Sequence, residues 1–208
     1  MKQLNNFIQE KLKVNSKSKI NNYKLSYFPK DEYELIALLK KLIKERGDNA
    51  DLNDIDVSKV RDMAMLFNDL RDIKNIDVSE WDVNNVENMA GMFAHCENFN
   101  SDLSKWDVSN VENMAGMFNN CNNFNSDLSK WNTKKVKTTS YMFHDCKQFD
   151  SNLSNWNMTN NDYAISMFAG CKNLKSTNFN KWCINFSRMS MSEMFKGCDK
   201  KIIPNWYK

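Results

Sequence analysis

The chain has 208 residues, of which 41% are hydrophobic and 12% aromatic, enough for one ordinary domain or one elongated repeat domain with an apolar core. Its 5 glycines and 2 prolines exclude a loop-rich or disordered chain. A formal net charge of +3 excludes the clustered basic excess of nucleic-acid-binding proteins, and no run of about 18 apolar residues offers a transmembrane helix.

The first residues, MKQLNNFIQEKLKVNSK, contain neither an apolar run of secretory length nor a cleavage-like site, so no signal peptide is expected. We therefore expect a cytoplasmic location with reduced cysteines, and association with a particle or a surface is the alternative. Within this stretch, Phe7, Ile8 and Leu12 are spaced for a first helix.

Residues 1–50 are predicted to form an N-terminal cap whose main helix lies near 31–46. Pro29 stands near the start of this helix and Gly47 just past its end. One apolar stripe runs along the helix: Leu35, Ile36, Leu39, Leu42 and Ile43. We expect the helix to close the first repeat against water, because the end units of repeat arrays expose their core.

Residues 51–201 contain six repeats of about 25 residues, followed by a C-terminal tail or cap over 202–208. A Met-Phe pair recurs, as Leu66-Phe67 in the first repeat and then at Met92-Phe93, Met117-Phe118, Met142-Phe143, Met167-Phe168 and Met194-Phe195. A tryptophan column comprises Trp81, Trp106, Trp131, Trp156, Trp182 and Trp206. Single-residue insertions are needed near Asn75, Thr177 and Phe186 to keep the repeats in register.

The spacing of apolar residues predicts local structure within each repeat. Met89, Met92, Phe93 and Cys96 are spaced i, i+3, i+4 and i+7, which predicts a short helix, and a short strand is expected near 101–104. A strand and a helix in each repeat of roughly 20–29 residues is the leucine-rich-repeat plan. The predicted fold class is an α/β repeat solenoid, leucine-rich-repeat-like, in which neighbouring units bury the faces that one unit cannot bury alone.

Five cysteines stand three residues after the Phe of each later Met-Phe pair: Cys96, Cys121, Cys146, Cys171 and Cys198. Metal sites usually need close pairs such as Cys-x2-Cys, and the sequence has none. We predict a ladder of small buried thiols, with disulfides or a metal as alternatives. Cys183 lies off this ladder and is expected to be more exposed.

An Asp/Asn column opens the repeats: Asp51, Asp77, Asp102, Asp127, Asn152 and Asn178. It suggests either calcium or turns held by side chains, and the absence of glycine-rich turns favours the turns. The two histidines, His95 and His144, form no defensible arrangement for nucleophilic catalysis, and no phosphate-binding glycine loop occurs. We predict no catalytic, metal or cofactor-binding residues; a hydrolase or metal protein is the least favoured hypothesis.

The position before each tryptophan changes from acidic to basic along the chain, and basic residues are most frequent around the fourth repeat. The residues concerned are Lys105, Lys130, Lys134, Lys135, Lys137 and Lys147. They form either a solvated face or a binding patch for an acidic protein partner, since charge on a regular face steers association.

The motif Asn88 to Phe93, followed by Phe99 to Val111 (FNSDLSKWDVSNV), resembles the BspA-type leucine-rich-repeat family, including the 25-residue lipoprotein repeats of mycoplasmas. The resemblance covers about residues 51–200 and implies a leucine-rich-repeat-like solenoid that often serves as a surface or adhesion module. It implies no catalytic residues.

These observations together predict a non-enzymatic protein–protein interaction module. The alternative is a structural or adhesive component of a bacterial surface or a phage particle. Partner and oligomeric state are not specified by the sequence.

Overall fold

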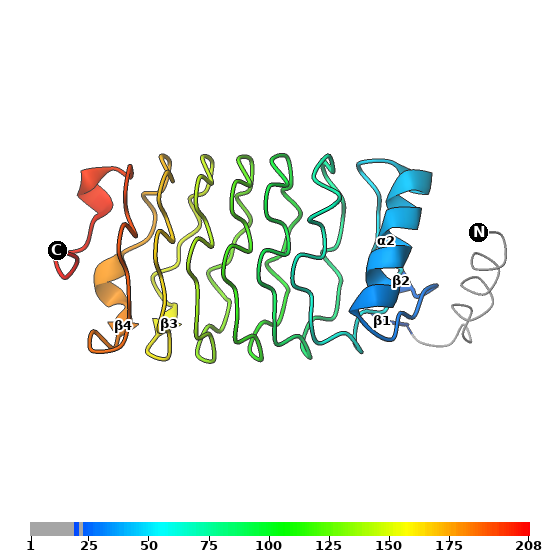
Figure 1. Ribbon diagram of the computed structural model, residues 1–208, viewed down its shortest axis with the longest axis horizontal. Helices are drawn as coiled ribbons and strands as arrows, with labels where there is room; N and C mark the ends of the chain where they lie inside the picture. The colour runs from blue at the N-terminus through cyan, green and yellow to red at the C-terminus, as the bar shows by residue number, and fades with distance from the viewer. Residues whose placement is uncertain (1–18, 21–22) are drawn as a thin grey trace.

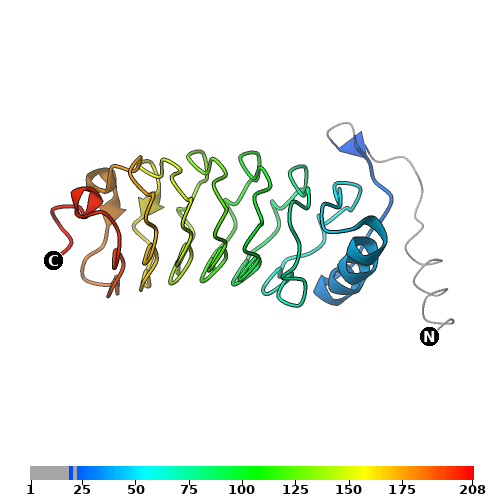
Figure 2. The ribbon, with the colours of Figure 1, turned by 90° about the horizontal axis from the view of Figure 1, so that it is seen from above.

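A computed structural model describes residues 19–20 and 23–208. The chain winds through a row of coils that lie side by side between α2 at one end and a short tail at the other (Figures 1 and 2). The coils begin at the starts of the six repeats, and we number them 1 to 6. Most of the chain is irregular. The first helix expected around Phe7, Ile8 and Leu12 lies outside the described residues.

The regular elements are few and short. Strands β1 (Lys19–Ile20) and β2 (Tyr23–Lys24) pair antiparallel, and β3 (Asn157–Met158) pairs parallel with β4 (Cys183–Ile184). Two 3-10 turns, η1 (Phe179–Lys181) and η2 (Lys200–Ile202), lie in the last coil and beyond it. None of the helices in the described part of the chain is long and apolar enough to cross a membrane.

Helix α2 (Glu32–Arg46) confirms the predicted helix over 31–46. The Asp31 side chain accepts a hydrogen bond from the Glu34 N–H at 2.9 Å, and Gly47 ends the helix with a φ of +86°, which glycine adopts without strain. Its buried stripe joins the core of coil 1 and comprises Leu35, Leu38, Leu39, Leu42 and Ile43. The Arg46 guanidinium then binds both carboxylate oxygens of Asp54, at 2.8 and 2.9 Å, which ties the helix to the first coil.

The short helix predicted over Met89 to Cys96 is wrong, and so is the strand near 101–104: both segments are turns and extended chain. Gly91 and His95 have φ values of +60° and +65°, in the left-handed region that no right-handed helix contains. The N–H groups of Met89 and Gly91 therefore donate to carbonyls of coil 3, both at 2.8 Å, and not along the chain.

The segment 89–95 has an equivalent in every coil, and we call these the ladder segments: 63–67, 89–95, 114–120, 139–145, 164–170 and 191–197. Parallel bridges link the residue before each ladder segment to its neighbour, from Asp62 through Asn88, Asn113, Thr138 and Tyr163 to Ser190. The bridges span 26 residues across the insertion near Asn75 and 27 across the two insertions near Thr177 and Phe186, so these insertions are absorbed outside the ladder.

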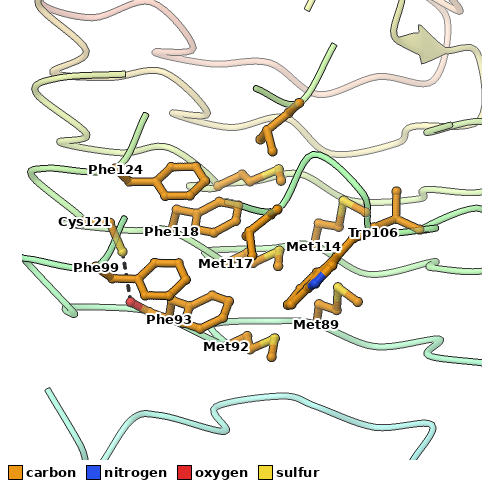
Figure 3. Packing of buried hydrophobic residues seen from close by; sticks show 14 of the residues in the cluster. Met89, Met92, Phe93, Phe99, Trp106, Met114, Met117, Phe118, Cys121 and Phe124 are labelled. Atoms are coloured by element: carbon orange, nitrogen blue, oxygen red, sulfur yellow. Dashed lines mark hydrogen bonds between the residues drawn. The ribbon is translucent and has the colours of Figure 1, made fainter. Parts of the chain in front are cut away.

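The interior is a set of aromatic and sulfur-containing columns (Figure 3). The Phe93 and Phe118 rings stack 5.8 Å apart at 3°, and Phe143 follows 5.6 Å from Phe118. Each indole N–H of the tryptophan column donates to a carbonyl of the preceding coil at 2.8–3.2 Å. The buried residues Met89, Met92, Phe93 and Cys96 show that the predicted apolar face is correct although the helix is not.

Two glycines in left-handed conformation give a test of the ladder geometry. A Cβ at Gly170 (φ +78°) would lie 2.1 Å from Oδ1 of Asp145 and 3.3 Å from its Cα, whereas at Gly116 (φ +63°) the nearest atom is 3.9 Å away. We expect Gly116→Ala to lower the free energy of unfolding by about 1 kcal/mol through φ strain, and Gly170→Ala by about 2–3 kcal/mol because a clash is added. Urea unfolding of both variants measures these free energies. Equal losses of stability would contradict the close approach of Gly170 to Asp145.

Candidate functional site

The six predicted lysines are all exposed, but they do not form one patch. Lys134, Lys135 and Lys137 lie together in the turn after Trp131, and Lys135 and Lys137 line a shallow groove along one corner of the coils. Lys105 and Lys130 stand before their tryptophans, and Lys147 lies in the separate turn that begins at Cys146. Three of the six lysines therefore lie beside one another.

The corner groove consists of two open hollows of about 250 and 270 Å³ that share Glu112 and Lys135. The first is lined by Arg61, Asn85, Glu87, Asn110, Glu112 and Lys135. The second is lined by Glu112, Lys135, Lys137, Asn160 and Arg188. Four of these lining side chains are basic and two are acidic, so the groove carries a positive excess.

Ion pairs between neighbouring coils neutralise much of this corner. Arg61 binds Glu87 at 2.7 Å, Lys137 binds Glu112 at 2.6 Å, and Arg188 binds Asp162 at 2.7 Å. These six charges occupy one column of the repeat, a pattern that the sequence analysis missed although their spacing of about 25 residues would have revealed it. Exposed pairs of this kind stabilise by only about 0–1 kcal/mol, but they reduce the field available to a partner.

The remaining lysines differ in whether their ammonium groups form hydrogen bonds or ion pairs. The Lys135 ammonium donates to Oδ1 of Asn110 at 2.7 Å, and Lys105 forms an ion pair with Glu80. The ammonium groups of Lys130, Lys134 and Lys147 form no hydrogen bond or salt bridge within residues 23–208. Of the two lysines that line the groove, Lys135 is thus the one without a carboxylate partner among the described residues, and Lys134 is its neighbour in sequence.

A family model described as a Mycoplasma protein of unknown function, DUF285, matches residues 37–142 and again residues 103–206. The chain belongs to this family. The matches begin within α2 and end in the C-terminal tail, so the DUF285 segment includes all six coils. Neither the curated proteins nor the solved structures gave a match to the chain.

The cysteine ladder of this DUF285 chain consists of free thiols, and four of them have no exposed surface: Cys96, Cys121, Cys146 and Cys171. The thiols of Cys121, Cys146 and Cys171 donate to phenylalanine carbonyls of the preceding coil at 2.9–3.0 Å, as Figure 3 shows for Cys121 and Phe93. Burial raises the pKa of Cys96 to about 12 and holds the pKa of the other three well above the usual range. The prediction of buried thiols is confirmed for these four, whereas the fifth, Cys198 in the last coil, is half-buried; Cys183 is exposed as expected.

The Asp/Asn column that opens the DUF285 repeats holds turns, as predicted. The carboxylates of Asp102 and Asp127 accept from the backbone N–H groups of Ser104 and Ser129, both at 2.9 Å. The hydrogen bond from Ser129 lowers the pKa of Asp127. In residues 19–20 and 23–208, no group of three or more His, Cys, Asp and Glu side chains is arranged to hold a metal ion.

Proposed function

We propose that this DUF285 chain is a non-enzymatic protein–protein interaction module built on a leucine-rich-repeat-like solenoid of the BspA type. The resemblance of the repeats to that family supports the solenoid, and the bridges between coils at intervals of 25–27 residues are compatible with it. A stack of this kind offers a long, regular surface on which side chains of successive repeats are held at fixed spacing.

One observation carries the proposal: Lys134 and Lys135 project beside an open groove and contribute nothing to the core. Two adjacent exposed lysines without a carboxylate partner create a local positive potential, which steers an acidic partner toward this corner. A partner segment with carboxylates would find these two charges at the groove and beside it. The partner we propose is therefore an acidic protein surface.

Affinity capture from native lysate tests the proposal. The baits are the native chain, Lys134→Glu/Lys135→Glu, and the control Lys172→Glu/Lys175→Glu, which makes the same charge change at exposed positions in coil 5. We expect a partner that both the native chain and the control retain and the groove variant loses, by tenfold or more, about 1.4 kcal/mol. Lys137 stays unchanged because its replacement would also break the pair with Glu112.

Circular dichroism of each bait checks that the variants are folded. A partner retained equally by all three baits would locate recognition elsewhere on the stack. No specific partner with any bait would favour a structural or adhesive role, in which the stack assembles with copies of itself or with a surface.

A further inference from the structure

In each ladder segment the N–H groups that bond between coils all point toward the next coil, unlike those of an ordinary β-strand. In coil 2 the N–H groups of Met89, Gly91, Phe93 and His95 all donate to carbonyls of coil 3, at 2.7–2.9 Å. Coils 3, 4 and 5 repeat the same four bonds, and coil 1 makes three of them. In a regular strand, each residue presents its N–H and C=O on the same side, so an edge offers both. Here one edge of every ladder segment offers only N–H groups, and the other only carbonyls.

The last coil leaves its row of donors open. Met191, Glu193, Phe195 and Gly197 stand where Ala164, Ser166, Phe168 and Gly170 stand in coil 5, as the bonds of coil 5 to Ser190, Ser192, Met194 and Lys196 establish. In coil 5 each of those four N–H groups has a carbonyl acceptor. In coil 6 none of the four has an acceptor anywhere in residues 19–20 and 23–208.

The C-terminal tail closes the core behind this edge and buries Phe195, and it leaves the other three edge residues at least partly exposed. The Tyr207 ring contacts the Phe195 ring, with centroids 5.1 Å apart, and its hydroxyl accepts from the Met194 N–H at 3.0 Å. Glu193 and Gly197 remain exposed, and Met191 is half-buried. Both exposed residues have left-handed φ values, +56° and +77°, like their equivalents in the preceding coils.

The charge around the edge has the same sign as the donors. Residues 186–208 contain five basic and two acidic residues, and one of the basic residues, Arg188, is paired with Asp162 of coil 5 at the corner groove. Lys200 and Lys201 are exposed at the start of η2 and form no salt bridge within the described ranges. The Lys196 ammonium is already bound to Glu193, at 2.9 Å.

We propose that the open edge of coil 6, comprising Met191, Glu193 and Gly197 with Lys200 and Lys201, binds the carboxylates of an acidic segment of a partner protein. A row of donors alone fits oxyanions, which only accept hydrogen bonds, and not a β-strand, whose own N–H groups would face those of coil 6. The exposed Lys200 and Lys201 supply the matching charge. This inference rests on the proposed interaction function and adds to it a second surface, separate from the corner groove.

A second copy of the chain is the other occupant that the bonding pattern suggests. Its complementary acceptors would be the carbonyls of Asp62, Ala64 and Leu66 in coil 1. Those carbonyls lie at the end of the stack that α2 closes, with Leu35 and Leu39 in the core (Figure 1). The exposed Lys200 and Lys201 beside the edge are why we favour an acidic segment over head-to-tail assembly.

Amide exchange and NMR titration test the proposal. In the full chain without ligand, we expect the amides of Met191, Glu193 and Gly197 to exchange with deuterium at least about tenfold faster than those of Ala164, Ser166 and Gly170. The probe is an acetylated, amidated octaglutamate peptide, with octaglutamine as its uncharged control. Octaglutamate should shift the coil 6 amides and slow their exchange, more strongly at low salt, and octaglutamine should not.

Three variants complete the test. Lys200→Glu/Lys201→Glu should weaken octaglutamate binding by about tenfold or more, and Glu193→Ser should strengthen it, because Ser166 has the same backbone conformation (φ +51°) without the charge. Lys134→Glu/Lys135→Glu should leave the coil 6 shifts unchanged. Shifts confined to the corner groove would overturn this inference and leave the proposed function standing. If the coil 6 amides became protected simply on raising the concentration of the chain, the occupant of the edge would be a second copy and the proposal would be wrong. If inorganic phosphate bound as tightly as octaglutamate, the edge would be a simple anion site and not a site for an acidic segment.

Discussion

Between about pH 9 and 11, the free energy of unfolding is expected to fall by about 5 kcal/mol for each unit of pH. The cause is the ladder of buried thiols, Cys96, Cys121, Cys146 and Cys171, which have no exposed surface. Burial disfavours the thiolate and raises the pKa of each, to about 12 for Cys96. The unfolded chain has no such restriction, and its thiols titrate near 8.5.

The sign follows from the direction of these shifts. Because the pKa of each thiol is higher in the folded chain than in the unfolded one, the stabilisation is fully present below about pH 8.5 and is lost as the pH rises toward the folded pKa. In that window unfolding releases up to one proton per buried thiol. Each proton contributes about 1.4 kcal/mol per unit of pH, and four give about 5 kcal/mol.

Urea unfolding at a series of pH values, with a reducing agent present, measures the slope. Cys146→Ala should lower the slope by about 1.4 kcal/mol per unit of pH, since one proton is no longer released, and Cys198, whose pKa burial raises to about 11, adds its own proton to the native chain and the variant alike. Cys183→Ala is the matched control, because this thiol is exposed, and should leave the slope unchanged. A slope that does not respond to Cys146→Ala would show that tyrosines and lysines, and not the ladder, govern alkaline unfolding.

The columns of the repeat could be read from the sequence because each is defined by side chains at a constant spacing. The Trp, Phe and Cys columns, helix α2 and the turns at Asp102 and Asp127 all follow from such patterns. The incorrectly predicted helix shows that the spacing of apolar residues alone does not determine the backbone conformation. Buried residues at i, i+3, i+4 and i+7 fit a helix, but they also fit a ladder segment, in which bonds such as Met92 N–H to Met89 C=O close turns of similar length.

A signal against the helix was present in the sequence. The left-handed residues of the ladder segments fall in two columns, and several are residue types that tolerate positive φ, among them Gly91, Gly116, His95, Asn120 and Asp145. Met65 and Tyr141 obscure the first column because neither favours that conformation. Reading the column as a whole, and not each residue alone, would have predicted turns.

Of the candidate sites, one could be predicted from columns of side chains in the sequence and the other could not. The pairing of Lys137 with Glu112 and of Lys105 with Glu80 joins residues 25 positions apart, so sequence columns contain that information. The open row of N–H groups in coil 6 is a property of the backbone, which every residue except proline carries. It becomes visible only when the direction of the ladder bonds and the end of the stack are known.

Phe118→Ala is expected to lower the free energy of unfolding by about 3–5 kcal/mol, the usual cost of removing a fully buried ring. Phe118 has no exposed surface, and its ring contacts those of Phe93, Phe124, Trp131 and Phe143, with centroids 3.9–6.4 Å apart. These neighbours belong to three successive coils, each fixed by its own bridges, so the cavity is unable to collapse and most of the loss persists.

The control for this prediction is Phe186→Ala in the last coil. Phe186 is 57% exposed and contacts only the Trp206 ring among the described aromatic side chains, at 5.7 Å, so its loss should cost less than about 1 kcal/mol. Thermal and urea unfolding of both variants give the comparison. If Phe118→Ala cost no more than Phe186→Ala, the aromatic columns would not be the source of cohesion between coils. A large loss at Phe118 combined with a broadened transition would show in addition that the stack can divide at coil 3, because each coil of a linear array is stabilised chiefly by its immediate neighbours.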